Sequence, residues 1–172
     1  MTGFEAGPET ARGRAIYAML LAVHDAIRRN LELIQALAAQ ALDGVDAEDL
    51  RRQLDDLKRN SMLWRLQVNC LRYCSFVHSH HHAEDADFFS ELRHTNPAIN
   101  PVIDRLQADH RRVADDLEAV ETAANRLTDH DGREARQAVV DALQALRENL
   151  LAHLEFEELN LEVTVRRVRE LA

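Results

Sequence analysis

The sequence predicts an all-α protein, an up-down-up-down bundle of four helices, and three observations support this fold class. Glycine and proline are rare, with five and three in 172 residues. Apolar residues recur three and four positions apart along almost the whole chain, which is the period of an amphipathic helix. No stretch alternates apolar and polar residues over the length of a strand. Stripes of this kind joined by short connections are typical of a helix bundle, and we expect one domain over residues 1–172.

The first helix is expected to begin near Pro8 to Thr10, because proline suits the first turn of a helix, and to end by Asp43-Gly44. Its apolar stripe is interrupted by one histidine, His24. The segment that follows, about residues 45–60, is highly charged and has only a thin leucine stripe. We therefore expect a short extra helix or insert there, between the first two long helices, with Ser61 as the cap of the next one.

The second helix carries the densest group of residues with metal-binding side chains, the run from His78 to Asp85. Alone, this run would also suit an exposed polar helix. The apolar stripe that leads into it decides which side chains face the core, and its members are Leu63, Leu66, Cys70, Tyr73, Val77, His80, Glu84 and Phe88. This phase places His80 and Glu84 on the buried face, one turn apart, with His81 beside them and the other two histidines of the run turned away.

Two further stripes contain histidines at positions that are otherwise apolar. Two proline steps end the second helix and start the third, which extends from about Pro101 to Leu127. In this third helix, His110 occupies a position whose neighbours in the stripe are all apolar. A turn at residues 128–132 leads to the fourth helix, in which His153 and Glu157 both lie in the stripe, one turn apart.

These interrupting residues are predicted to lie at one depth in the bundle. A helix rises about 1.5 Å per residue, so the depth of a side chain follows from its distance along the chain to the nearest connection. Counted in this way, the polar positions of the four helices are level if the second long helix begins near Ser61. The resulting layer comprises His24, His80, Glu84, His110, His153 and Glu157.

Such a layer requires a partner, because an isolated buried charge costs several kcal/mol even after the protein relaxes around it. Mixed imidazole and carboxylate donors disfavour calcium and magnesium, which prefer oxygen ligands, and suit iron, manganese or zinc. Two carboxylates placed between two groups of histidines would suit the bridging of a dinuclear centre. The sequence therefore predicts a metal site in the bundle core.

The remaining composition argues against several classes of function. The formal net charge is -9 with a pI near 5.4, and no basic patch stands out, so we expect no nucleic-acid partner. No apolar segment is long enough to span a bilayer and the first residues do not form a leader peptide, so we expect a cytoplasmic protein with no membrane partner. Cys70 and Cys74 lie one helical turn apart and are predicted to be reduced thiols in the core.

These motifs resemble the hemerythrin family, specifically the bacterial HHE-type cation-binding proteins. The residues that carry the resemblance are His24, the run HSHHHAEDADFF from His78, the pair Asp109-His110 and the run HLEFEE from His153, and together they cover most of the chain. The resemblance implies a di-iron centre with an oxo or hydroxo bridge, in which one iron has an open position for dioxygen or another small ligand. Zinc and manganese are the alternative occupants.

Carried onto this chain, the resemblance assigns the metal ligands residue by residue. Glu84 and Glu157 would bridge the two ions. The terminal ligands would be His24, His80, His110 and His153. His81, three residues before Glu84, stands where some relatives place another ligand, and we include it in the expected set.

Other residues near the layer have weaker signals. Asp85, Asp109 and Glu158 each flank a proposed ligand by one position and could orient an imidazole, or could be exposed acids on the helix surface. Tyr73, two turns before His80 in the same stripe, could reach the open side of the centre or could fill the core. Two further histidines that fall in connections, His94 and His130, are expected to be exposed.

Two departures from the oxygen-carrying hemerythrins bear on the expected function. Ala114 stands where those proteins have a second histidine on the third helix, and Glu157 follows His153 by four residues, where they have an aspartate after five. A smaller number of histidines would leave more room for water, peroxide or substrate. A ferritin-like di-iron site is set aside because it needs two ExxH motifs, and only Glu91 to His94 fits.

Three functions agree with this prediction. The first is a non-haem di-iron protein that binds dioxygen or a related small ligand for sensing, storage or detoxification. The second is a di-iron oxidase or oxygenase, an oxidoreductase that acts with dioxygen or peroxide. The third is a metal-storage or structural metal-binding bundle. We rank the first ahead of the others, and the sequence leaves enzymatic activity and oligomeric state open.

Overall fold

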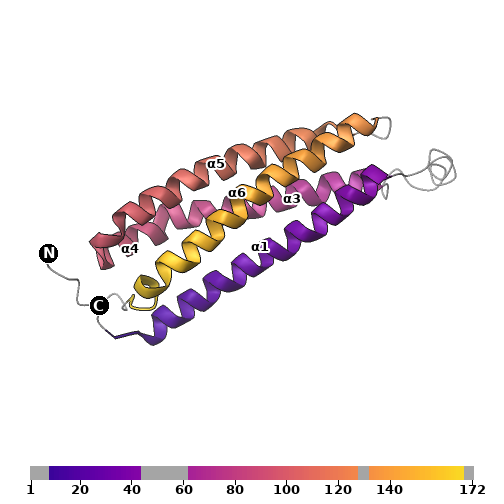
Figure 1. The fold of residues 1–172 in the computed structure, drawn as a ribbon. Helices are drawn as coiled ribbons and strands as arrows, with labels where there is room; N and C mark the ends of the chain where they lie inside the picture. The colour runs from indigo at the N-terminus through magenta and orange to yellow at the C-terminus, as the bar shows by residue number, and fades with distance from the viewer. Residues whose placement is uncertain (1–7, 44–61, 128–131, 169–172) are drawn as a thin grey trace.

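Within the described residues, four long helices run alternately up and down and confirm the predicted all-α bundle (Figure 1). The computed structural model describes residues 8–43, 62–127 and 132–168. The long helices are α1 (Ala11–Asp43), α3 (Met62–Ala83), α5 (Asn100–Asn125) and α6 (Arg133–Val165). Helix α1 packs on α3 and α6, and α5 packs on the same two helices. The expected insert at about 45–60, its neighbour Ser61, and His130 lie outside the described residues.

Helix α1 begins where a threonine caps it, close to the predicted start. Thr10 Oγ1 accepts a hydrogen bond of 2.9 Å from Gly13 N and donates one of 2.6 Å to Val168 O. Thr10 N donates to Arg166 O at 2.9 Å, which ties the start of α1 to the end of α6. A side chain at Gly13 would collide with the backbone of Arg166, so the close approach of the two helix ends requires glycine there.

The second predicted helix is continuous, but it contains a turn of a different kind. After α3 come a π-helical turn, η1 (Glu84–Phe88), and then α4 (Phe89–Thr95). A 3-10 turn, η2 (Pro97–Ile99), leads into α5. A π-helical turn bonds residue i to i+5, so it moves the side chains after it by about one position around the helix.

This shift in phase corrects one residue of the predicted core. The sequence stripe placed Phe88 on the buried face, four residues after Glu84. In the structure Phe89 is buried, with 1% of its surface exposed, and Phe88 is only partly buried. The prediction for Phe88 holds only in part, because Phe88 packs against the smaller apolar cluster while η1 gives the fully buried position to Phe89.

The core consists of two apolar clusters with a polar layer between them. The larger cluster extends over α1 from Ile27 onward, over α3 as far as Val77, over α5 from Val113 onward, and over α6 as far as Leu154. Buried members of the smaller cluster, at the other end of the bundle, include Tyr17, Leu20, Phe89, Ile103, Leu106 and Leu161. The histidines and glutamates predicted to share one depth lie between these two clusters.

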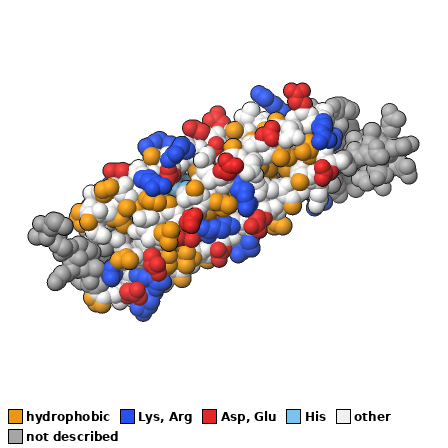
Figure 2. Space-filling model, in the orientation of Figure 1, with side chains coloured by type: hydrophobic (Ala, Val, Ile, Leu, Met, Phe, Trp, Pro, Cys, Tyr) orange, Lys and Arg blue, Asp and Glu red, His pale blue; other side chains and the backbone are white. Residues whose placement is uncertain are grey.

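The outside of the bundle carries mixed charge. Figure 2 shows acidic and basic side chains distributed over the visible face, with small apolar patches between them. Two of the exposed large apolar residues are Leu33 on α1 and Phe76 on α3, which are 67% and 39% exposed. Among the described residues, none of the helices combines the length and the apolar character that crossing a membrane requires.

Candidate metal centre

The residues predicted to bind metal lie together in the middle of the bundle, and each of the long helices contributes at least one. Six of them are buried, with 5% of their surface or less exposed: His24, His81, Glu84, His110, His153 and Glu157. The remaining one, His80, is partly buried, with 10% of its side chain exposed. The common depth expected from counting residues along the helices is therefore present in the structure. We call these seven residues the polar layer.

The ligand atoms of the polar layer form two groups. In one group, a ring nitrogen from each of His81, His110 and His153 lies within 4.8 Å of the other two. In the other group, ligand atoms of His24, His80 and Glu84 meet the same condition. This spacing is on the order of twice a metal–ligand bond of about 2.1 Å, so either group could close on one ion. His80 and His81 join different groups because successive side chains of a helix point about 100° apart.

Two glutamates connect the two groups. Glu84 Oε1 lies 3.3 Å from Nε2 of His80, and Glu84 Oε2 lies 3.5 Å from Nε2 of His110. Glu157 Oε2 lies 3.5 Å from Nε2 of His24 and 3.6 Å from Nε2 of His153. Each carboxylate therefore reaches an imidazole of both groups, which is the placement that a ligand bridging two ions needs.

The ring of His110 is held between flat neighbours. It stacks on His81, with ring centroids 4.1 Å apart and an interplanar angle of 12°. It also stacks on Phe89, at 5.4 Å and 19°. Phe89 enters the core because η1 shifts the phase of the helix, so this turn supplies both Glu84 and the aromatic contact that fixes His110.

Two imidazoles of the layer lie beside carboxylates outside it, and one of these imidazoles is hydrogen-bonded to its carboxylate. His24 Nδ1 donates to Glu158 Oε1 at 2.8 Å, and Arg28 Nη1 donates to the same oxygen at 2.8 Å. His110 Nδ1 lies 3.1 Å from Asp85 Oδ1. A carboxylate that binds the Nδ1 proton leaves the free lone pair on Nε2, the nitrogen that faces the glutamates of the layer. Glu158 is therefore placed as the sequence suggested, whereas Asp85 lies near His110 Nδ1 without a hydrogen bond to it.

Asp109, the third acid considered for this role, has other partners. Its carboxylate pairs with Arg112, and its Oδ2 lies 3.7 Å from Arg105 Nε. The guanidinium of Arg105 also lies 3.6 Å from the centre of the Phe156 ring, which belongs to α6. Asp109 is buried and is the neighbour of His110 in the sequence, as expected. Its carboxylate, however, belongs to a network with two arginines of α5.

Buried polar atoms without a hydrogen-bond partner are concentrated in the polar layer. They include the Nε2 atoms of His24, His80, His81, His110 and His153 and both carboxylate oxygens of Glu84 and Glu157. Leaving one buried polar atom unsatisfied costs about 1–3 kcal/mol, so this many in one place is unfavourable without a ligand. Each of these atoms is a good donor for a transition metal, and the set therefore fits a metal cofactor.

Burial decides the charge of the metal-free layer. It lowers the pKa of His80 to about 3 and that of His153 to about 2, and neighbouring histidines add to the effect. It also lowers the pKa of His81 and raises the pKa values of Glu84 and Glu157, which lie close to each other. Without metal, the imidazoles are therefore neutral and the carboxyl groups retain protons well above their ordinary range. A cation entering the layer would displace those protons.

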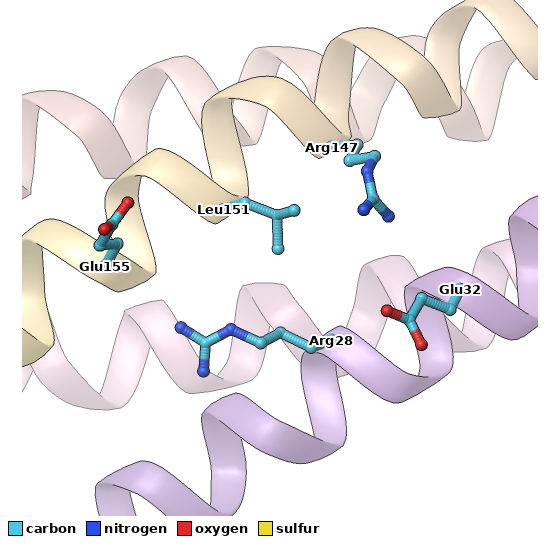
Figure 3. Close-up of a pocket in the computed structure, with 5 residues that line it drawn as sticks. All are labelled: Arg28, Glu32, Arg147, Leu151 and Glu155. Carbon is cyan, nitrogen blue, oxygen red and sulfur yellow. The ribbon is translucent and has the colours of Figure 1, made fainter.

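The side chain of Arg28 bonds to Glu158 beside the polar layer and also lines a groove on the outside of the bundle (Figure 3). The groove has a volume of about 340 Å³ and is lined by Arg28 and Glu32 of α1 and by Arg147, Leu151 and Glu155 of α6. Its two arginines and two glutamates balance in charge. Arg28 links it to the polar layer, because Arg28 and His24 both bond to Glu158 Oε1.

The sequence reasoning missed Arg28. The available signal was its position four residues after His24, which puts the two side chains one turn apart on α1. That signal was weak, because an arginine at this spacing more often points to solvent. The bond to Glu158 depends on how α1 packs against α6, and the sequence alone does not specify that packing.

The other predicted residues have structural roles or are exposed. Tyr73 lies in the larger apolar cluster with 4% of its surface exposed, in agreement with the second of the two roles considered for it. Cys70 and Cys74 are free and buried, which agrees with the prediction of core thiols, and burial raises the pKa of both to about 12. His94 is exposed, as are the two histidines of the run that the apolar stripe turned away from the core.

Comparison with known proteins gives one match. The family model described as Hemerythrin HHE cation binding domain matches residues 15–162. This interval contains the whole polar layer and most of the four long helices. No curated protein and no solved structure was found to match the chain.

Proposed function

The chain belongs to the hemerythrin HHE cation-binding family, and we propose that its polar layer holds two iron ions and binds dioxygen or a related small ligand. The observation that carries this proposal is the position of Glu84 and Glu157, each of which reaches imidazoles of both histidine groups. A bundle that held a single ion would need only one of these groups. The unpartnered ligand atoms of the layer also support metal binding.

The two histidine groups differ in the number of ligands that they offer. His81, His110 and His153 would hold one ion, and His24 and His80 would hold the other, with the two glutamates shared. The second ion would therefore receive one imidazole fewer than the first. We propose that this ion has the open position at which a small ligand binds. The mixed imidazole and carboxylate donors suit iron, with zinc and manganese as alternatives.

Iron held in the layer would supply the redox chemistry by which dioxygen is bound or reduced. The residues around the layer would orient its imidazoles and exclude water. Glu158 and Asp85 would hold His24 and His110 with Nε2 turned toward the ions. The apolar clusters on both sides of the layer would keep water away from it, which strengthens the electrostatic interactions within.

The test is exposure of the reduced, iron-loaded protein to oxygen, followed by removal of the oxygen. We expect ligand-to-metal absorption bands that appear with oxygen and disappear when it is removed. The expected bands should be absent from a zinc-loaded sample prepared in parallel. An iron-loaded protein whose spectrum does not respond to oxygen would contradict the proposal and favour metal storage or a structural site.

The alternative function, a di-iron oxidase or oxygenase, rests on the same open position. A position that admits dioxygen beside His24 and His80 would also admit peroxide, and Ala114 does not supply a further imidazole. The same samples distinguish the two functions. Consumption of dioxygen or peroxide over many cycles, in place of a reversible spectrum, would assign an enzyme.

A further inference from the structure

A second groove lies between α1 and α3, on a different face from the one that Arg28 lines. Its volume is about 540 Å³, within the range of about 300–1,000 Å³ that small-molecule sites occupy. Helix α1 contributes Leu33, Ile34 and Leu37 to it, and α3 contributes Tyr73 and Phe76. The apolar part of this surface is accessible at its edges, because Leu33 and Phe76 are largely or partly exposed.

The charged residues of the α1–α3 groove are all of one sign. Arg65 and Arg72 line it, and Asn30, Gln40 and Asn69 supply the other polar side chains. No aspartate or glutamate is present among the described residues that line the groove. In a chain with a formal net charge of -9, this is a local reversal of sign. Arg65, Asn69 and Arg72 follow one another at spacings of four and three, so they share one stripe along α3.

Tyr73 also lines the groove, although only 4% of the residue is exposed. Its hydroxyl is buried in the core without a hydrogen-bond partner, so the groove presents the body of this residue and not its hydroxyl.

We propose that the α1–α3 groove binds an organic monocarboxylate with an apolar body. Its carboxylate would lie over Asn69, between the guanidinium groups of Arg65 and Arg72, which suit the planar carboxylate. The apolar body would cover Leu33, Leu37 and Phe76. This site shares no residue with the polar layer, so the proposal does not rest on the metal chemistry.

The experiment is isothermal titration calorimetry of the full-length protein with two probes, decanoate and 3-phenylpropanoate, below micellar concentrations. Decanol and decyltrimethylammonium serve as probes with the same apolar chain and no negative charge. We expect at least one carboxylate to bind at one equivalent per chain, at least about tenfold more tightly than the uncharged and cationic probes. Failure of both carboxylates to bind would overturn the proposal, as would equal affinity for decanol.

Variants locate the site. The double substitution Arg65→Gln/Arg72→Gln should weaken carboxylate binding by about tenfold or more. The double substitution Arg126→Gln/Arg133→Gln removes the same charge from exposed positions outside the groove and should have no effect. Carboxylate binding that survives Arg65→Gln/Arg72→Gln unchanged would overturn the proposal.

Two further measurements separate the groove from the metal centre and from a dimer interface. A carboxylate could ligate the metal, so the titration is repeated with Glu157→Ala, in which binding should persist. A second copy of the chain could cover the groove, so sedimentation is measured with the wild-type protein and with Leu33→Asp/Phe76→Asp. A monomer in both cases is expected, and a wild-type dimer that dissociates in the variant would overturn the proposal in favour of self-association.

Discussion

On α5, Val113 and Leu117 are completely buried against apolar side chains, whereas His110, almost one turn before Val113, is buried beside glutamates and other imidazoles. The two regions share the same helices and the same three-four spacing. The apolar cluster needs no ligand, because its side chains gain stability from burial itself. The polar layer has unpartnered ligand atoms and needs one. The comparison indicates that the cluster holds the fold together, whereas the layer could hold a metal ion.

The largest expected effect is the loss of metal when the layer is altered. Glu157→Ala removes the carboxylate that reaches His24 and His153, and His110→Ala removes an imidazole from the three-histidine group. We expect either variant to retain half or less of the wild-type metal content, measured by elemental analysis after purification without chelator. The matched control is His78→Ala, an exposed histidine on α3, which should retain it all.

Wild-type metal content in both Glu157→Ala and His110→Ala would show that these residues are not ligands and would remove the proposed layer. Circular dichroism of each variant establishes whether the bundle is still folded. Glu157→Gln keeps the volume of the side chain but lacks the negative charge, so it separates loss of the ligand from loss of packing.

A substitution in the larger apolar cluster should lower stability and leave the metal content unchanged. Leu117→Ala removes a fully buried side chain and should lower the free energy of unfolding by about 2–5 kcal/mol. The metal content of the folded protein should not change, because Leu117 lies outside the polar layer. Urea unfolding and elemental analysis of the same sample check both statements. A Leu117→Ala protein that is as stable as wild type but has lost its metal would reverse the comparison.

A third effect concerns pH and the metal-free protein. Histidines whose pKa is lowered in the folded state cost stability as pH falls below their ordinary value of 6.5, because the unfolded chain binds the proton. Glutamates whose pKa is raised cost stability as pH rises above 4.5, because the unfolded chain releases the proton. Five histidines of the layer are shifted in this way but only two glutamates, so the free energy of unfolding should rise with pH up to about 6.5 and fall above it. Each group contributes up to about 1.4 kcal/mol per pH unit.

Metal binding should change this pH dependence. Bound metal replaces the protons of Glu84 and Glu157, so the loss of stability at alkaline pH should disappear in the loaded protein. Urea unfolding of metal-free and loaded samples between about pH 5 and pH 9 gives the two curves, a range that includes the ordinary histidine value. A metal-free protein whose stability is constant across this range would contradict the charge states assigned to the layer.

The smallest expected effect concerns the residues that orient His24. Glu158→Gln keeps the shape of the side chain but removes the charge that holds the Nδ1 proton, and we expect metal affinity to fall by about tenfold. Arg28→Gln should have a weaker effect in the same direction, since Arg28 acts through Glu158. Glu155→Gln is the control, because Glu155 lines the same groove as Arg28 but is exposed. Competition with a chelator of known affinity measures all three.

Much of the fold and the members of the polar layer could be predicted from the sequence, because both follow from the helical period. Positions on the buried face of a helix recur every three or four residues. A histidine at such a position, like His110, can therefore be identified from the sequence as a buried polar residue. The matching depths of His24 and His80, and of His110 and His153, follow from the constant rise of a helix. Whether these residues bind metal is decided by the metal content of the Glu157→Ala and His110→Ala proteins.

The features that could not be predicted depend on departures from the regular helix or on packing between helices. The π-helical turn η1 changes the helical phase after Glu84. For this reason the apolar period predicted a buried Phe88, whereas the fully buried residue is Phe89. The bond from Arg28 to Glu158 joins α1 to α6, which are far apart in the sequence. The unpartnered hydroxyl of Tyr73 likewise becomes visible only when the surroundings of each side chain are known.

The most direct test of a bridged centre is an anaerobic titration of the metal-free protein with ferrous iron, followed by spectroscopy of the iron environment. Two donor groups bridged by Glu84 and Glu157 predict saturation at two irons per chain, with the two ions magnetically coupled after oxidation. The Glu157→Ala protein should saturate lower and show no coupling. Saturation of the wild-type protein at one iron, or two irons without coupling, would contradict a bridged centre in the polar layer.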